Sequence, residues 1–240
     1  MPDETLILVA TFVSLFVSSV AGYGGSLLLV PALAAIMGPR EGIAFAALLL
    51  GWNNVFKVIV YRKTLALRQG WPLIAVTAVG VVIGARLLVS SSDRLIVGLI
   101  VTVTIATLVM ELVASDELLE QRRHAAVPAM AAASVLSGVS GSSGPLKGIS
   151  IRSLGLPRLE HVGIAASVSL VADTLKVKLF AEAGLLADVD MRTLLVAVPM
   201  MPVGAWVGRE VNRRVDESTF RWVFWTVVGG YTMRMVGVWF

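Results

Sequence analysis

Long apolar segments, separated by short polar turns, follow one another along this chain of 240 residues. Eight can be read, at positions 5–37, 42–60, 71–89, 95–114, 127–150, 161–180, 193–208 and 220–240. An α-helix needs roughly 20 residues to cross a bilayer, and most of these segments approach that length. Of all residues 57% are hydrophobic and 15% are charged, whereas a soluble domain has about 25% charged residues. We therefore expect an all-α integral membrane protein.

The polar turns between these segments are too short to hold a folded soluble domain, so one membrane domain over 1–240 is expected. Met1-Pro2-Asp3-Glu4 is acidic and lacks the basic region of a signal peptide, so the first apolar segment should be retained. Basic residues stand singly or in pairs at segment ends instead of forming one basic stretch. This pattern favours a lipid bilayer as partner and argues against nucleic acid. A homo-oligomer is left open.

Two apolar segments are interrupted by small residues and proline. The first interruption covers 22–31 with the sequence GYGGSLLLVP, and the second covers 138–145 with the sequence GVSGSSGP. Such residues end helices and leave backbone N–H groups unpaired. A bilayer tolerates unpaired groups only inside protein or beside a water-filled cavity. Because paired breaks in two halves mark the substrate site of many transporters, we expect a transporter for a small anion.

The two halves repeat, over about 1–114 and about 127–240. Four features recur in the same order: the two breaks, Asn54 to Lys57 with Asp173 to Lys176, Gly84-Ala85 with Gly204-Ala205, and Asp93 with Asp216. The offset between matched positions rises slowly, as small loop insertions after a duplication would produce. The common order indicates two repeats of four apolar segments.

The orientation of the repeats follows from the charges of the turns. If each broken segment is a re-entrant hairpin followed by three transmembrane helices, the repeats are inverted. That arrangement places eleven Lys and Arg residues inside and four outside, against nine and six for eight full crossings. The stretch Val127 to Ser137 is also too short to span at 1.5 Å per residue. We predict inverted repeats with both termini outside the cytoplasm, which is the periplasmic side if the membrane is a bacterial inner membrane. Eight crossings with parallel repeats remain the alternative.

The tips of two hairpins that enter from opposite sides would meet near the middle of the bilayer. A helix that begins at such a tip directs its first N–H groups and positive dipole end at a bound anion. The candidate residues in the two tips are Gly24, Gly25, Ser26, Gly141, Ser142 and Ser143. The alternative is close helix packing, for which small residues are also common.

A second set of candidates lies on a later segment of the first half. On a helix Asn53, Asn54 and Lys57 share one face, which places amide donors beside an ammonium group. Ionisable groups within membrane segments are costly and usually face a cavity or each other. Lys57 therefore either contacts the substrate or extends to the cytoplasmic interface.

The counterpart in the second half has a carboxylate in place of the amide. Asp173 and Lys176 have the same spacing of three residues, and Lys147 follows the second break. Asp173 either couples transport to protons or simply pairs with Lys176 or Lys178. Lys147 and Lys176 are further candidate contacts for the anion.

Catalytic and metal-binding motifs are not found. His124 and His161 lack the spacing of metal ligands, and there is no cysteine. No Ser/His/Asp set, HExxH or GxxxxGK[ST] occurs. We expect neither an enzyme nor a bound metal or other cofactor. A passive anion channel or a membrane assembly factor is the alternative to a carrier.

The run Gly22 to Gly25, followed closely by Val30-Pro31, resembles the first motif of the sulfite exporter TauE/SafE family. The chain length, the eight segments and the twofold repetition are similar as well, so the resemblance covers nearly the whole chain. It implies transport of sulfite, sulfonates such as sulfoacetate, or related anions across the bacterial inner membrane. Ser26 replaces a third glycine of the family pattern, and the second break is rich in serine. A small carboxylate without sulfur is the alternative substrate.

Overall fold

The computed structural model describes residues 4–21, 25–113, 125–187, 189, 191–212, 226, 229–230, 233 and 237. Within this part of the chain the regular structure is helical, without strands. The helices are α1 (Glu4–Ala21), α2 (Gly25–Met37), α3 (Pro39–Val60), α4 (Leu67–Ser90), α5 (Asp93–Val113), α7 (Ala126–Ser140), α8 (Gly144–Arg152), α9 (Arg158–Glu182) and α10 (Met191–Asn212). The predicted all-α class is confirmed. Most of the predicted segment 220–240 lies outside the described residues.

Both predicted breaks separate two helices. α1 ends at Ala21 and α2 begins at Gly25, and positions 22–24, which include Gly24, lie outside the described residues. α7 ends at Ser140, three residues beyond the predicted half-segment. Gly141 follows with φ of 76°, a backbone conformation that glycine adopts without the penalty of a Cβ atom. α8 packs back against α7, so the second break is the tip of a hairpin.

Two helices have the length and apolar composition of membrane spans. Among the described residues these are α3 and α4, of 22 and 24 residues, with mean hydropathy 1.8 and 2.2. At 1.5 Å per residue a helix of this length covers about 33 Å, enough for a hydrocarbon core of about 30 Å. α9 is as long, but Asp173, Lys176 and Lys178 interrupt its apolar character.

The outer surface of α4 is apolar as well as its inner surface. Val79, Ile83 and Leu87 are exposed, whereas Val81 and Leu88 on the same helix are fully buried. A helix that is hydrophobic on all sides is typical of the interior of a large protein or of a membrane. Here the exposed apolar side is suited to lipid.

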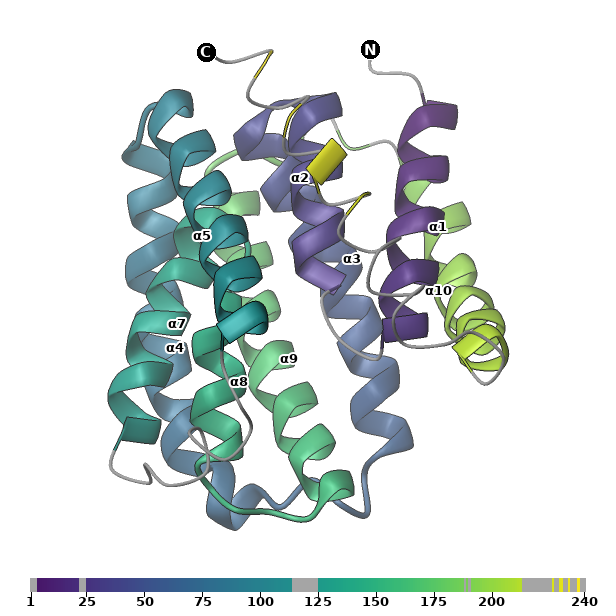
Figure 1. Ribbon diagram of the computed structural model, residues 1–240. Helices are drawn as coiled ribbons and strands as arrows, with labels where there is room; N and C mark the ends of the chain where they lie inside the picture. Colours follow the sequence, from purple (N-terminus) through teal and green to yellow (C-terminus); the bar gives the residue numbers. More distant parts are fainter. Residues whose placement is uncertain are drawn as a thin grey trace.

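Helices of the first half pack on helices of the second half (Figure 1). α1 contacts α10, α4 contacts α7, and α3 contacts α9. α3 and α9 are antiparallel, because Gly163 near the start of α9 lies against Thr64 just after α3, while Asp173 further along α9 bonds Asn54 further back on α3. In Figure 1 α2 lies toward the top of the bundle and α8 toward the bottom, so the short helices of the two hairpins occupy opposite ends.

Glycine allows α4 and α7 to approach closely. A Cβ atom on Gly84 of α4 would lie 2.2 Å from the carbonyl oxygen of Val135, and one on Gly138 of α7 would lie 2.7 Å from the nitrogen of Ala85. Small residues permit this kind of backbone contact between membrane helices. The contact joins the two halves of the chain.

Candidate functional site

The two breaks meet, as the hairpin arrangement predicts. The hydroxyl of Ser26, the second residue of α2, lies 3.2 Å from the hydroxyl of Ser142 in the turn between α7 and α8. Ser140 donates a hydrogen bond of 3.1 Å to the carbonyl oxygen of Ser142 and thereby fixes the turn. Ser142 is buried and Ser26 is half-buried. Two serines far apart in the sequence therefore form one polar contact inside the bundle.

Gly141 lets this turn approach α2 and α3. A Cβ atom on Gly141 would lie 2.8 Å from a methyl group of Val30 and 3.2 Å from one of Ile43. On this side the turn is thus packed against apolar side chains. Ser143 immediately precedes α8 and makes no capping hydrogen bond with its side chain, and Gly25 is the first residue of α2. Binding of a substrate by the residues of the tips stays a prediction.

A buried carboxylate lies where α3 crosses α9. Asp173 Oδ1 is 2.7 Å from the ammonium of Lys176, and Asp173 Oδ2 accepts a hydrogen bond of 2.8 Å from the amide of Asn54. Asp173 is 4% exposed and Lys176 is 1% exposed. The Lys176 ammonium also donates to the hydroxyl of Ser137 on α7 at 3.5 Å. Burial of these charges is possible because both oxygens and the ammonium have partners.

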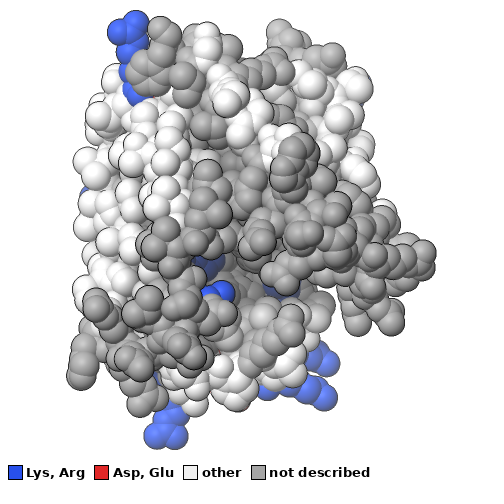
Figure 2. All heavy atoms as spheres, in the orientation of Figure 1, with Lys and Arg blue, Asp and Glu red and all other residues white. Residues whose placement is uncertain are grey.

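Two further lysines lie near this pair. Lys57 of α3 and Lys147 of α8 both lie within electrostatic range of the Asp173 carboxylate. Lys147 is half-buried and donates to the hydroxyl of Ser169 on α9. The side chain of Lys57 is exposed. Figure 2 shows Lys and Arg atoms inside a hollow near the middle of one face of the molecule.

We name this set the lysine cluster: Lys57, Lys147, Lys176 and Asp173. When all three lysines are protonated, the set holds three positive charges and one negative charge, of which Lys176 and Asp173 form an ion pair. Excess charge in a protein interior is costly unless an opposite charge offsets it. A bound anion would supply that charge. The cluster is therefore suited to hold an anion at the junction of α3, α8 and α9.

The sequence predicted most of these residues but not their partners. The structure brings five of the predicted site residues close together from helices α3, α8 and α9. They are Asn54, Lys57, Lys147, Asp173 and Lys176. The side chain of Asn53 is half-buried and forms no hydrogen bond with another described residue. Of the two lysines predicted as partners of Asp173, Lys176 forms the ion pair and Lys178 is exposed.

Two serines of the site were missed. Ser137 lies one residue before the second break, and Ser169 precedes Asp173 by four residues on α9. Residues four apart share a helix face, so the position of Ser169 was a usable signal. Each of these hydroxyls accepts a hydrogen bond from a lysine of the cluster.

Comparison with known proteins identifies the family. Residues 6–235 match the family described as sulfite exporter TauE/SafE. Neither the curated proteins nor the solved structures gave a match. The match covers nearly the whole chain and includes both hairpins and the lysine cluster. Since so much of the sequence matches, this chain belongs to the sulfite exporter TauE/SafE family of membrane transporters.

Proposed function

We propose that this protein carries a small sulfur oxyanion or organosulfur anion, such as sulfite or a sulfonate, across the bacterial inner membrane. The observation that carries the proposal is the lysine cluster, in which one ammonium group pairs with a buried carboxylate and two more lie within electrostatic range of it. The family supports a sulfur-containing substrate. The charge of the cluster supports an anion, and an anion with two negative charges would balance it.

The accessibility of the lysines indicates an order of events in binding. Lys57 and Lys147 are the more accessible cations, so the anion meets them first. Lys176 is buried and held by Asp173, so it reaches the anion only by exchanging its partner. Asp173 then keeps the hydrogen bond from Asn54 and becomes free to take up a proton. This exchange would couple anion movement to proton movement.

The contacts between the halves support inverted repeats. Ser26 and Ser142 occupy matching positions and contact each other, and so do Asn54 and Asp173. Matching residues meet in this way when they lie beside a twofold axis. The antiparallel course of α3 and α9 supports an axis in the membrane plane, the arrangement found in many secondary transporters. Alternating access would then come from movement of one repeat against the other, with both termini in the periplasm.

An uptake panel on purified protein in phospholipid vesicles tests the proposal. Sulfite, sulfate, thiosulfate, sulfoacetate and simple carboxylates are offered in turn, with empty vesicles as the control. The proposal expects saturable uptake of a sulfur anion and counterflow against the same anion loaded inside. Uptake that rises without saturation and lacks counterflow would indicate a channel instead. Uptake of carboxylates alone would overturn the sulfur substrate.

A further inference from the structure

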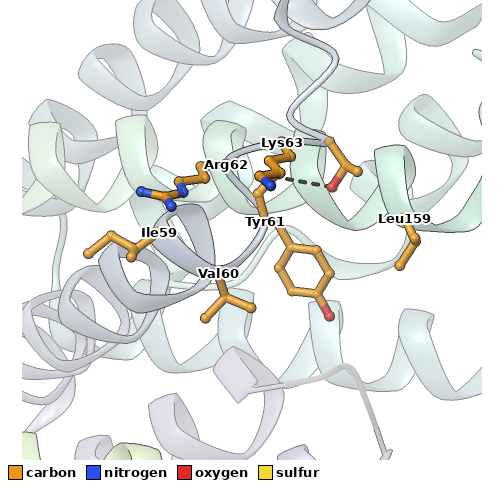
Figure 3. A pocket seen from close by; sticks show the side chains of 7 residues that line it. Ile59, Val60, Tyr61, Arg62, Lys63 and Leu159 are labelled. Carbon is orange, nitrogen blue, oxygen red and sulfur yellow. Dashed lines mark hydrogen bonds between the residues drawn. The ribbon is translucent and has the colours of Figure 1, made fainter.

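A pocket lies at the end of α3. It encloses about 560 Å³ and is lined by residues 59–64 and Leu159 (Figure 3). Leu159 precedes Asp173 by fourteen positions on α9, which corresponds to about 21 Å along the helix. None of the lining residues belongs to the lysine cluster, although Lys57 precedes Ile59 on α3 by only two residues.

The pocket combines apolar walls with unpaired positive charge. Val60 is 74% exposed and Leu159 is 58% exposed. Arg62 and Lys63 are exposed and have no ion-pair partner among the described residues. In Figure 3 the side chains of Val60, Tyr61 and Leu159 project to one side of the turn, and Arg62 and Lys63 lie on the other.

The turn that carries these side chains is held in place. The hydroxyl of Thr64 donates to the carbonyl oxygen of Tyr61 at 3.2 Å, and the N–H of Tyr61 continues the last turn of α3. On its other side the carbonyl oxygen of Thr64 lies where a Cβ atom on Gly163 of α9 would meet it at 2.2 Å. The pocket is thus formed before any ligand arrives.

Its position matches the boundary between hydrocarbon and headgroups. α3 is long enough to cross the hydrocarbon core and ends at Val60, so the turn lies at the bilayer surface. Trp71, one turn into α4, is 64% exposed, as expected of an aromatic side chain in the interfacial belt. The basic residues of this turn place it on the cytoplasmic side in the proposed topology, on which this inference rests.

We propose that this pocket binds the headgroup of an anionic phospholipid of the cytoplasmic leaflet. Arg62 and Lys63 supply charged donors for the phosphodiester, and the apolar side chains of Val60 and Leu159 lie beside the acyl chains. Basic pockets between membrane helices on this side are suited to anionic lipid headgroups. A soluble phosphate would use only the charges and leave the apolar walls exposed.

Native mass spectrometry of the purified full-length chain tests the site with phosphatidylglycerol, phosphatidylcholine and glycerol phosphate as probes. We expect phosphatidylglycerol to be retained most strongly. Each basic residue near an anionic headgroup contributes about fivefold, so the double variant Arg62→Gln/Lys63→Gln should lose about 30-fold in affinity. Leu159→Trp, which fills the pocket without changing charge, should also weaken retention.

The matched control removes the same charge from the other end of the bundle. Arg86 and Arg94 are exposed, and Arg86→Gln/Arg94→Gln should retain phosphatidylglycerol like the unmodified chain. Equal loss in both double variants, or no loss in the first, would overturn the site, as would tighter binding of glycerol phosphate than of the lipid. Sulfite counterflow is measured in the same preparations. Counterflow without lipid preference overturns only the lipid site, and lipid preference without counterflow overturns only the proposed transport.

Discussion

Asn54 of α3 donates a hydrogen bond of 2.8 Å to Asp173 of α9, the residue that matches it in the other half of the chain. The two residues differ by one group, an amide against a carboxylate. At this junction the two halves are therefore chemically unequal. The other oxygen of Asp173 pairs with the ammonium of Lys176. One buried carboxylate therefore links a residue of the first half to a residue of the second half.

The buried ion pair predicts an unequal response to single and double variants. Asp173→Asn leaves the Lys176 ammonium without its counter-charge, and breaking a buried pair in this way costs about 3–5 kcal/mol. Asp173→Asn/Lys176→Met removes both charges and should recover most of that loss. Thermal unfolding of the purified variants measures the difference. A double variant no more stable than the single variant would contradict the pairing.

Proton coupling predicts a specific loss in the same single variant. Asp173→Asn cannot release or take up a proton at this position, so uptake should no longer depend on a pH gradient across the vesicle. The measurement compares uptake with and without the gradient, in Asp173→Asn and in the unmodified protein. Lys178→Gln, an exposed change on the same helix, serves as control and should keep the dependence. Dependence that persists in Asp173→Asn would exclude this residue from coupling.

The serine contact at the tips predicts a loss of transport without a loss of insertion. Ser142→Leu places a branched side chain where the hydroxyls of Ser26 and Ser142 lie 3.2 Å apart. Uptake should be abolished while the protein still fractionates with membranes. Ser90→Leu changes an exposed serine that bonds only to carbonyl groups of its own helix, and its uptake should be unchanged. Normal uptake by Ser142→Leu would contradict a role for the tips.

The close contact between α4 and α7 predicts a position-dependent cost of adding a side chain. Gly84→Val forces atoms against the backbone of α7, where a Cβ atom alone would meet Val135 at 2.2 Å. Overpacking of this kind costs about 1–3 kcal/mol or more. Gly98→Val makes the same change on α5, where nothing lies within 4 Å of the added Cβ. The midpoint of thermal unfolding should be lower for Gly84→Val than for Gly98→Val. Equal midpoints would contradict the close contact.

Helices and breaks were predictable because apolar runs and helix-ending residues are local signals. The start of α3 illustrates the limit. The apolar run predicted a helix that begins at position 42, but the helix begins at Pro39. Proline is well suited to the first helical position, and Gly38 forms the preceding turn with φ of 102°. The prediction used only the apolar run and did not use Gly38-Pro39 as a signal for the start of the helix.

The candidate site was predictable as a set of residues but not as a set of contacts. Ionisable groups inside apolar segments stood out because burial makes them costly. Their partners depend on how α3, α7, α8 and α9 cross, which is set by contacts between distant parts of the chain. Lys147 bonds Ser169 and Lys176 bonds Ser137. The spacing of Ser169 from Asp173 places both on one helix face, but it does not reveal which lysine bonds to either serine. The approach of Gly141 to Val30 was hidden for the same reason.

The most direct test of anion binding at the lysine cluster is sulfite counterflow in vesicles that contain purified Lys57→Gln/Lys147→Gln. Both substitutions remove accessible cations and leave the buried Asp173–Lys176 pair in place, so the variant should fold and insert. We predict counterflow in the unmodified protein and its loss in the double variant, with Arg86→Gln/Arg94→Gln as the charge-matched control that retains it. Counterflow of equal rate in all three proteins would contradict the account.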